Sequence, residues 1–377
     1  MATLNEVVGA IENITFKDGH LLVGGWVASL DSRPIAEFRV SSRHMNLPGA
    51  SWEYGIPNRA GKAGVGRANC GFRIRVPMRA AAGARSRDLL VSVTAMIARA
   101  RSRSLFAILK PSLPIPRWRD WAMVGGSFFP DACNILGSLV SDARLARNET
   151  VLDIGCGVGR IAYVLSYYLS RAGRYEGLEP VKRWVRRNQA VVGARFRNFR
   201  FKTLAIHNPV YNSKGALEPS SVRFPYPDGT FDLAIASSVF QHNRAATVRH
   251  YLGEIERVLR PSGRCLVTCF LLGAKPPSGL PKKSPLRFVH PVKGGWTATP
   301  DLPEFGIAFL ERDFRRWAAR HRLIVRTKFD GAWHNRGPSN FYQDMVILQK
   351  PGVRRSSDIF QGSRVKQKLE HLANNSD

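Results

Sequence analysis

Along the first hundred residues, apolar side chains recur at every second position rather than every third or fourth. Three runs show this spacing between polar or proline neighbours: Ala36, Phe38 and Val40; Phe72, Ile74 and Val76; and Val91, Val93 and Ala95. A period of two is typical of strands with one buried face. Turn residues separate the runs, for example at Asp18-Gly19 and Gly24-Gly25. The pattern predicts an all-β domain over residues 1–110, with a small β-sandwich as the simplest arrangement.

Three prolines within residues 111–116 interrupt the chain after this region. Successive prolines disfavour helix and favour an extended, stiff connector, so we place a linker at 111–117. An aromatic-rich stretch follows at 118–129, and a helix is expected over 130–144. At the other end, residues 351–377 are polar and mildly basic, which predicts a disordered tail with a helical piece near 365–372.

From residue 150 onward the pattern changes to short apolar runs that alternate with helical spacing. Val151, Leu152 and Ile154 form the near-continuous apolar run of a strand buried on both faces, and residues 161–169 show the spacing of an amphipathic helix. Further strands are expected at 175–179, 199–203, 231–238, 264–272, 323–328 and 344–349, and helices at 181–189, 248–259 and 311–321. The alternation predicts an α/β domain with a doubly wound, mostly parallel sheet over residues 118–350.

The turn after the first of these strands carries three glycines at alternate positions, Gly155, Gly157 and Gly159, with Asp153 two positions before them. A tight strand-to-helix turn would by itself explain glycines. However, the second strand ends in Glu179, where nucleotide-binding α/β folds place the carboxylate that binds ribose hydroxyls. The D-x-G-x-G-x-G pattern resembles the first motif of class I S-adenosylmethionine (SAM) dependent methyltransferases. A dinucleotide-binding dehydrogenase would more often show G-x-G-x-x-G.

Two later stretches strengthen this resemblance. Residues 224–232 read F-P-x-x-D-x-x-F-D, and Ser238 to His242 read S-V-F-x-H, as in type 11 methyltransferases. The resemblance implies a Rossmann-like seven-stranded sheet and SAM as the cofactor. It also implies a set of cofactor-binding residues: Asp153, Gly155, Cys156, Gly157, Gly159, Glu179, Pro180, Ser237, Ser238 and Val239. Many members have an acid after the third strand that holds adenine. Residues 204–207 offer none, so either backbone groups and apolar contacts hold adenine here or the cofactor binds less tightly than usual.

His242 is the candidate catalytic residue, because the carboxyl ends of parallel strands open onto the ligand crevice. It would act as general base for a hydroxyl acceptor, with a structural histidine as the alternative. Asp344 is a weaker candidate. Asn208-Pro209-Val210-Tyr211 superficially resembles the N-P-P-Y motif of amino-methyltransferases, but it precedes the fourth strand, and we assign it no catalytic role. Residues 273–303 exceed ordinary loop length, which predicts an active-site lid or mobile insertion.

The net charge of the chain does not identify the methyl acceptor. Lys and Arg number 57 against 28 Asp and Glu, a formal net charge of +29. Such a field attracts anions of any kind, including nucleic acid and anionic membrane surfaces. In the β-region, the placement of Gly25-Trp26, Pro34 and Gly71-Phe72 with Pro77 resembles small β-sandwich accessory domains of bacterial glycosyltransferases and glycan-modifying enzymes. Such a domain would bind a glycan or a partner, with a structural or dimerising role as the alternative. This resemblance and that to type 11 methyltransferases favour methyl transfer to a hydroxyl of a glycan, lipid-linked sugar or other small acceptor. The alternative is an RNA- or nucleic-acid-binding protein, with or without methyl transfer. A third possibility is a scaffold protein that retains the fold but has no catalytic activity.

The five cysteines are scattered and form no C-x-x-C pair, which indicates a reducing compartment and predicts no metal site. The first residues lack the basic and apolar regions of a signal peptide, and no stretch approaches the roughly 20 apolar residues of a membrane span. We therefore expect a cytoplasmic protein, with association at the inner membrane surface through its basic charge.

Overall fold

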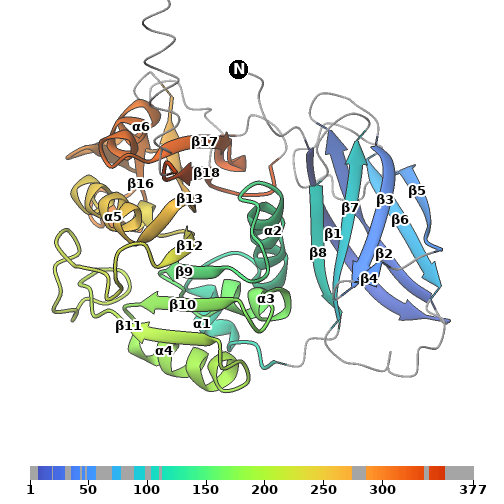
Figure 1. Ribbon diagram of the computed structural model, residues 1–377. Helices are drawn as coiled ribbons and strands as arrows, with labels where there is room; N and C mark the ends of the chain where they lie inside the picture. The colour runs from blue at the N-terminus through green and yellow to red at the C-terminus, as the bar shows by residue number, and fades with distance from the viewer. Residues whose placement is uncertain are drawn as a thin grey trace, which may run out of the picture.

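The computed structural model describes residues 7–18, 20–29, 35–42, 45–46, 49–56, 70–77, 89–97, 103–109, 113–273, 286–334 and 339–352. Within these ranges the chain forms a β-rich N-terminal part, drawn in blue to teal in Figure 1, and a larger α/β part. The predicted tail lies outside the described residues from position 353 onward.

The N-terminal part consists of two four-stranded antiparallel sheets. One has the order β1 (Val7–Lys17), β2 (His20–Ser29), β6 (Gly71–Pro77) and β5 (Ser51–Ile56), and the other β4 (Met45–Asn46), β3 (Ile35–Ser42), β7 (Leu89–Ile97) and β8 (Arg103–Leu109). Both sheets contribute side chains to one apolar core, which includes Val23, Phe38, Phe72 and Val93. The alternation at 72–76 and 91–95 therefore predicted the buried faces of β6 and β7.

In β3 only the first position of the predicted alternation, Ala36, is wrong. Ile35 is buried and Ala36 is exposed, although Phe38 and Val40 face the core as expected. The register of β3 on β7 shifts between Ile35 and Glu37. A bulge adds one residue to a strand, so the strict period of two fails across it.

The α/β part is built on a ten-stranded mixed sheet rather than the expected seven strands. Five parallel strands have the order β11 (Phe199–Thr203), β10 (Arg174–Glu179), β9 (Thr150–Ile154), β12 (Phe231–Ala236) and β13 (Leu259–Leu272). β18 (Asp344–Gln349) pairs antiparallel with β13, and β17 (Ile324–Phe329) pairs antiparallel with β18. From β13 the sheet also continues through β16 (Ile307–Leu310), β15 (Gly295–Thr297) and β14 (His290–Val292).

These last strands correct part of the predicted lid. Residues 290–297, which show no clear periodicity in the sequence, form a short hairpin that is added to the sheet through β16. Residues 274–285 of the same stretch lie outside the described residues.

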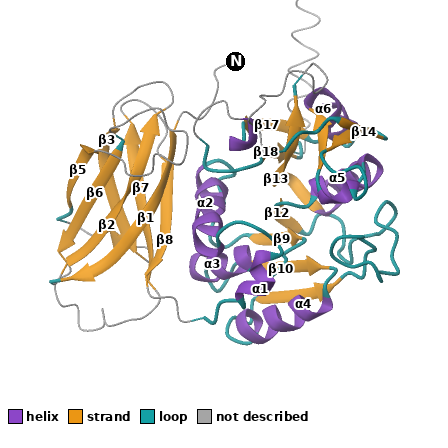
Figure 2. Cartoon of the chain, turned by 180° about the vertical axis from the view of Figure 1, so that it is seen from behind, coloured by secondary structure: helices purple, strands orange, loops and turns teal. Residues whose placement is uncertain are grey.

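Helices cover both faces of the sheet, as Figure 2 shows. α2 (Phe128–Ser141), α3 (Arg160–Tyr168) and α4 (Lys182–Asn188) share one core with alternate residues of β9 and β12, including Val151 and Leu233. α5 (Ala245–Val258) and α6 (Glu311–Arg320) share another with Leu152 and Ala234 on the opposite face. This double winding is the predicted fold class, because each parallel strand must be covered on both sides.

The N-terminal part packs directly against α2 and α3. Phe106 of β8 joins the same apolar core as α2, and its ring meets Tyr168 edge to face at 6.1 Å. The Ser104 N–H donates to Ser141 Oγ at 3.0 Å. The described part of the linker, from residue 113, also contacts the α/β part, because Leu113 is buried and Arg187 Nη2 lies 2.7 Å from the Pro114 carbonyl oxygen.

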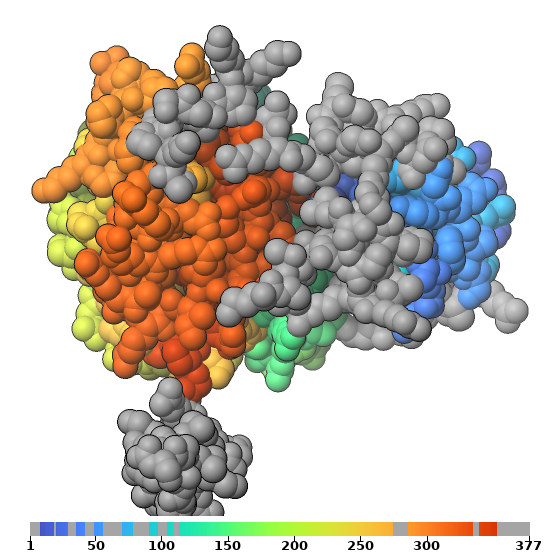
Figure 3. All heavy atoms as spheres, turned by 90° about the horizontal axis from the view of Figure 1, so that it is seen from above, coloured from blue at the N-terminus to red at the C-terminus, as the bar shows by residue number. Residues whose placement is uncertain are grey.

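Seen from above in Figure 3, the face of the α/β part is formed by the orange and red elements that follow residue 286. Among the residues that the structure describes, no helix is both long and apolar enough to cross a membrane.

Candidate active site

A pocket opens where β9, β10 and β12 end, at the carboxyl edge of the parallel sheet. Its walls come from three groups of residues: the glycine turn and the end of β10, the segment after β12, and a set of apolar side chains from elsewhere in the chain. The last set includes Val124, Ile135, Leu204, Ile206, Phe224 and Tyr251. Crevices at this edge are the usual ligand sites of doubly wound folds, so the location agrees with the prediction.

The glycine turn needs glycine for its backbone geometry. Gly155, Gly157 and Gly159 have φ values of 69°, 53° and 83°, which L side chains rarely adopt. The N–H groups of Gly155 and Cys156 both donate to the Leu178 carbonyl, at 2.8 and 3.0 Å. A Cβ atom built on Gly155 would lie 2.7 Å from Val239 Cγ2. The turn is therefore tied to β10 and keeps the pocket floor free of side chains.

Glu179 lies at the end of β10, where the sequence placed it. Its Oε2 accepts the Gly157 N–H at 2.8 Å and its Oε1 accepts the Val181 N–H at 2.9 Å. Burial raises the pKa of this carboxyl group to about 7, although the two N–H groups favour the anion. Glu179 thus joins the glycine turn to the strand and presents an acidic group to the pocket.

Eight of the ten predicted cofactor residues line this pocket, namely Gly155, Cys156, Gly157, Glu179, Pro180, Ser237, Ser238 and Val239. Asp153 and Gly159 do not. The Asp153 carboxylate is 1% exposed and accepts the Tyr175 hydroxyl at 2.6 Å, and burial raises its pKa to about 7. Gly159 precedes the first residue of α3. Both lie behind the pocket wall and shape it from there.

His242 lines the pocket from the 3-10 turn η3 (Phe240–His242). Its Nδ1 lies 2.9 Å from the Glu304 carbonyl oxygen, and its Nε2 lies 3.2 Å from the Tyr211 hydroxyl. Because a carbonyl can only accept, Nδ1 carries the proton in the neutral ring, and Nε2 is left to accept. Burial lowers the pKa of His242. The arrangement favours a neutral imidazole whose basic nitrogen is Nε2.

Tyr211 is a pocket residue that sequence reasoning set aside. Asn208 Oδ1 accepts the N–H groups of Val210 and Tyr211 at 3.0 and 3.1 Å, and Asn208 Nδ2 donates to the His242 carbonyl at 2.9 Å. The tyrosine ring meets the His242 ring edge to face at 5.0 Å. The segment is not the N-P-P-Y motif, but its asparagine folds a turn that brings Tyr211 to His242.

Ser238 occupies a strained backbone position at the pocket wall, with a φ of 56°. Its N–H donates to Thr268 Oγ1 at 2.7 Å, and its hydroxyl donates to Gln343 Oε1 at 3.1 Å. The hydroxyl of Thr268 donates to the same Gln343 oxygen at 2.7 Å. These bonds fix the first residues after β12 and bring Gln343, which the sequence did not single out, close to the pocket wall.

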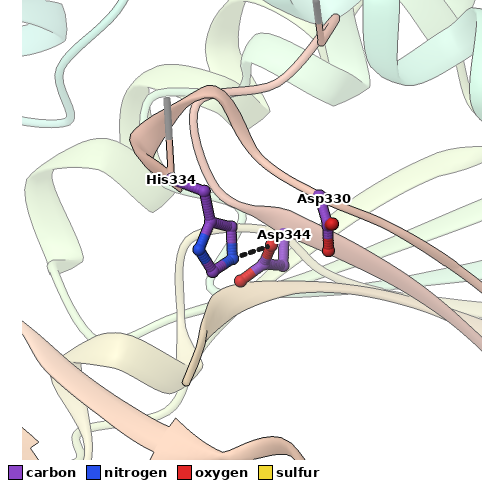
Figure 4. A group of neighbouring side chains, drawn as sticks. All are labelled: Asp330, His334 and Asp344. Carbon is purple, nitrogen blue, oxygen red and sulfur yellow. Dashed lines mark hydrogen bonds and ion pairs between the residues drawn. The ribbon is translucent and has the colours of Figure 1, made fainter. Parts of the chain in front are cut away.

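Asp344, the weaker catalytic candidate, is the first residue of β18 and belongs to a polar group in which Asp344 and His334 are buried and Asp330 is exposed. Figure 4 shows Asp330, His334 and Asp344, whose possible ligand atoms lie within 4.8 Å of one another. Asp344 already accepts from the Leu271 and Gly331 N–H groups, Trp333 Nε1 and His334 Nε2, and Lys328 Nζ lies 2.5 Å from Asp330 Oδ1. A metal ion would have to displace these donors. The group acts as a structural anchor for residues 330–334.

A second, strongly basic groove lies at the opposite edge of the sheet, where β10 and β11 begin. Its walls carry five exposed arginines: Arg171, Arg174, Arg195, Arg197 and Arg200. The only acidic side chain among its lining residues is Glu176, which lies 3.9 Å from Lys202 Nζ and accepts the Tyr226 hydroxyl at 3.2 Å. We call it the arginine groove.

Comparison with known proteins is consistent with this geometry. Residues 152–267 match the family described as "Methyltransferase domain", a stretch that runs from β9 into β13 and includes the glycine turn, Glu179 and His242. The α/β part therefore contains a stretch that matches this methyltransferase family, and the match supports SAM as the cofactor.

Solved structures with partial similarity include three methyltransferases. One is a SAM-dependent methyltransferase from Methanosarcina mazei, with 19% identity over 55% of this chain and 95% of that chain and a TM-score of 0.38. Another is a SAM-dependent methyltransferase from Aquifex aeolicus, with 17% identity over 54% of this chain and 84% of that chain and a TM-score of 0.36. The third is phosphoethanolamine N-methyltransferase 1 from Haemonchus contortus, solved with phosphoethanolamine and S-adenosylhomocysteine (16%, 60% and 43%, TM-score 0.37). All three TM-scores are below 0.5, and the assignment rests on the family match.

Proposed function

We propose that this protein transfers the methyl group of SAM to a hydroxyl of a glycan, lipid-linked sugar or other small acceptor, with His242 as the general base. The observation that carries the proposal is the neutral His242 ring, whose accepting Nε2 lies in the same pocket as the glycine turn and Glu179. A hydroxyl is a weak nucleophile, so a positioned base that removes its proton favours oxygen as the acceptor atom.

The pocket residues fit the cofactor. When bound, SAM supplies a methyl group on a positively charged sulfur, which an oxygen nucleophile can attack. Glu179 would accept hydrogen bonds from the ribose hydroxyls, and the side-chain-free turn at Gly155 would leave room for close approach. Leu204 and Ile206 line the pocket after β11 and would contact adenine through apolar surface, as the missing acid in this segment predicts.

Tyr211 indicates where an acceptor oxygen would bind, because its hydroxyl oxygen lies 3.2 Å from Nε2. Burial raises the pKa of Tyr211 to about 12, so it stays protonated and can donate but not act as a base at neutral pH. An acceptor hydroxyl in this place would give its proton to Nε2 while its oxygen formed the new bond to the methyl carbon. The bond between the methyl carbon and the SAM sulfur would break, and the sulfur would leave with the electron pair as a neutral thioether. The Glu304 carbonyl still accepts Nδ1–H and so stabilises the imidazolium that results.

The N-terminal part would serve as an accessory sandwich domain that recognises the acceptor. The outer face of its β1-β2-β6-β5 sheet is hollowed at Gly24 and lined with side chains that can hydrogen-bond to sugar hydroxyls, namely Asn13, Thr15, Glu53, Arg73 and Arg75. All five cysteines are buried thiols, which supports the proposed cytoplasmic location.

The experiment is an acceptor screen with SAM labelled in its methyl group. The protein is incubated with glycans, lipid-linked sugars and small hydroxyl compounds, and the labelled product is analysed for the bond formed. We expect an O-methyl product that the wild-type protein makes and His242→Ala makes far more slowly. A product methylated on nitrogen or carbon, at equal rates in both, would overturn the proposal.

Nucleic acid is the second candidate acceptor or partner, and the arginine groove is the observation that favours it. β10 has six residues, so the groove lies about 20 Å from the pocket at the other end of the strand. A bound strand would have to pass around the sheet edge to reach His242. Binding that discriminates among sequences at physiological salt, and is lost in Arg197→Glu/Arg200→Glu, would support this function. Binding that collapses steeply with salt would count against it.

A further inference from the structure

Three large apolar side chains are exposed within one nine-residue stretch that includes α1 (Trp118–Ala122). Trp118 is 67% exposed, Ile115 52% and Met123 48%. Trp121 of the same helix is half-buried and packs against the core. α1 therefore packs the indole of Trp121 against the molecule and presents the indole of Trp118 to solvent. An indole exposed to this degree is costly unless something covers it in use.

Cations surround these apolar side chains. Arg117 and Arg119 lie on the same stretch, and the α4 residues Lys182, Arg183 and Arg186 are exposed on the helix that stands beside α1 in Figures 1 and 2. The Arg119 guanidinium lies 5.8 Å from the centre of the Trp118 ring.

The two helices are joined by Arg183 and Asp120. Arg183 Nη2 lies 3.7 Å from Asp120 Oδ1 and 3.3 Å from Met123 Sδ, and Trp184 Nε1 donates to Asp120 at 3.3 Å. Within the described part of the chain, Arg117, Lys182 and Arg186 have no acidic partner. The surface thus combines an apolar centre with uncompensated positive charge around it.

We infer that this surface, formed by Ile115, Trp118, Met123 and the five surrounding cations, docks on an anionic lipid bilayer. We call it the α1–α4 surface. Tryptophan suits the boundary between headgroups and acyl chains because its ring is apolar and its N–H is polar. The lysine and arginine side chains would meet anionic headgroups, and their long apolar stems allow the charges to stay at headgroup level.

The α1–α4 surface adjoins the mouth of the pocket. Val124, the residue after Met123, lines the pocket, and Arg160, another lining residue, donates from its Nη2 to the Gly125 carbonyl. A protein docked through Trp118 would therefore hold the pocket against the membrane surface. This docked orientation selects a lipid-linked acceptor among the hydroxyl compounds, a conclusion that rests on the proposed function. The headgroup of such an acceptor could enter the pocket while its chains stay in the bilayer.

The test is sedimentation of the full chain with vesicles of phosphatidylcholine alone or with a third phosphatidylglycerol. We expect binding to the anionic vesicles only, weakened at least about tenfold both by Trp118→Ser and by Lys182→Glu/Arg186→Glu. Trp52→Ser is the matched control, since Trp52 is 40% exposed on β5 in the N-terminal part. Arg197→Glu/Arg200→Glu in the arginine groove is the matched charge control. Both control variants should bind as the wild type does.

Absence of binding to anionic vesicles would overturn the inference. The inference would also be overturned if Trp118→Ser left binding unchanged, or if only the arginine-groove variant lost binding. SAM titration of each variant separates this result from the proposed function, because Trp118 does not line the pocket and its loss should leave cofactor affinity intact. Quenching of tryptophan fluorescence by brominated lipid, present in the wild type and reduced in Trp118→Ser, would confirm that this ring enters the bilayer.

Discussion

Burial shifts the pKa values of Asp153, Glu179 and His242, which lie in and behind the pocket, and their effects on stability oppose one another. Asp153 and Glu179 have folded pKa values of about 7, above those of unfolded chains. The folded protein therefore holds more protons than the unfolded chain between about pH 4 and 7. The contribution of these two carboxyl groups to stability falls as pH rises through that window. The His242 pKa is lowered, so its contribution falls as pH drops below about 6.5.

The role of His242 can be tested by its pH profile. His242→Ala should lower kcat by about 10²-fold or more and leave the Kd for SAM nearly unchanged. In the wild type, kcat should rise with pH and level off, with a midpoint below about 6.5, because burial favours the neutral ring. Equal losses of kcat and cofactor affinity in His242→Ala would make this residue structural.

Tyr211→Phe tests the partner of that ring. The phenyl group keeps the packing against His242 but removes the hydroxyl that donates to neutral Nε2. Loss of this donor favours protonation, so the midpoint of the kcat/KM profile, which reports the free enzyme, should move to higher pH. A midpoint that stays in place would show that the 3.2 Å contact does not persist in the free enzyme in solution.

Glu179 should make cofactor affinity depend on pH. An ionised carboxylate accepts hydroxyl hydrogen bonds more strongly than a neutral acid, so SAM binding should strengthen as pH rises through about 7. Glu179→Gln should bind more weakly and without this dependence. Asp153→Asn, whose side chain lies behind the pocket, should keep it. Calorimetry across pH 5.5–8.5 checks this, and an unchanged slope in Glu179→Gln would contradict it.

The glycine turn shows how one element combines backbone strain with close packing. Gly155→Ala places a Cβ 2.7 Å from Val239 Cγ2 at a φ of 69°. Gly229→Ala is the matched control, because φ is 60° there and a Cβ would meet nothing within 4 Å. We expect Gly229→Ala to lower the free energy of unfolding by about 1 kcal/mol without changing SAM affinity.

Gly155→Ala should lower the unfolding free energy by more than Gly229→Ala and should also weaken SAM binding. Chemical denaturation and calorimetry measure the two effects. If the two variants were equally stable and bound SAM equally well, the close packing of the turn on Val239 would have no role in the site.

Elements whose signal is local could be predicted from the sequence, and contacts between distant segments could not. The glycine turn and His242 each follow a strand with a clear apolar run, and Glu179 is the last residue of the strand after the glycine turn. The Glu304 carbonyl that fixes the His242 ring is a backbone group 62 positions away, so no residue type reveals it. β14 and β15 have three residues each, too few to show a period, and Tyr211 depends on a turn made by Asn208.

At the scale of the molecule, the N-terminal part and the α/β part share buried surface through β8, α2 and α3. Phe106 is 7% exposed in this shared core. Phe106→Ala should lower the free energy of unfolding by about 3 kcal/mol, and both parts should unfold in one transition. Phe16→Ala on β1, where the ring is 46% exposed, should change it by less than about 0.5 kcal/mol. Two separate transitions, with only one displaced by Phe106→Ala, would contradict this coupling.

The central claim is that the pocket at the ends of β9, β10 and β12 binds SAM through Glu179. Titration calorimetry of the full chain with SAM tests it most directly. We predict one molecule bound per chain, with affinity reduced about 10- to 100-fold in Glu179→Ala, the effect of losing hydrogen bonds to a charged group, and retained in His242→Ala. No binding by the wild type, or equal affinity in the wild type and Glu179→Ala, would contradict the claim.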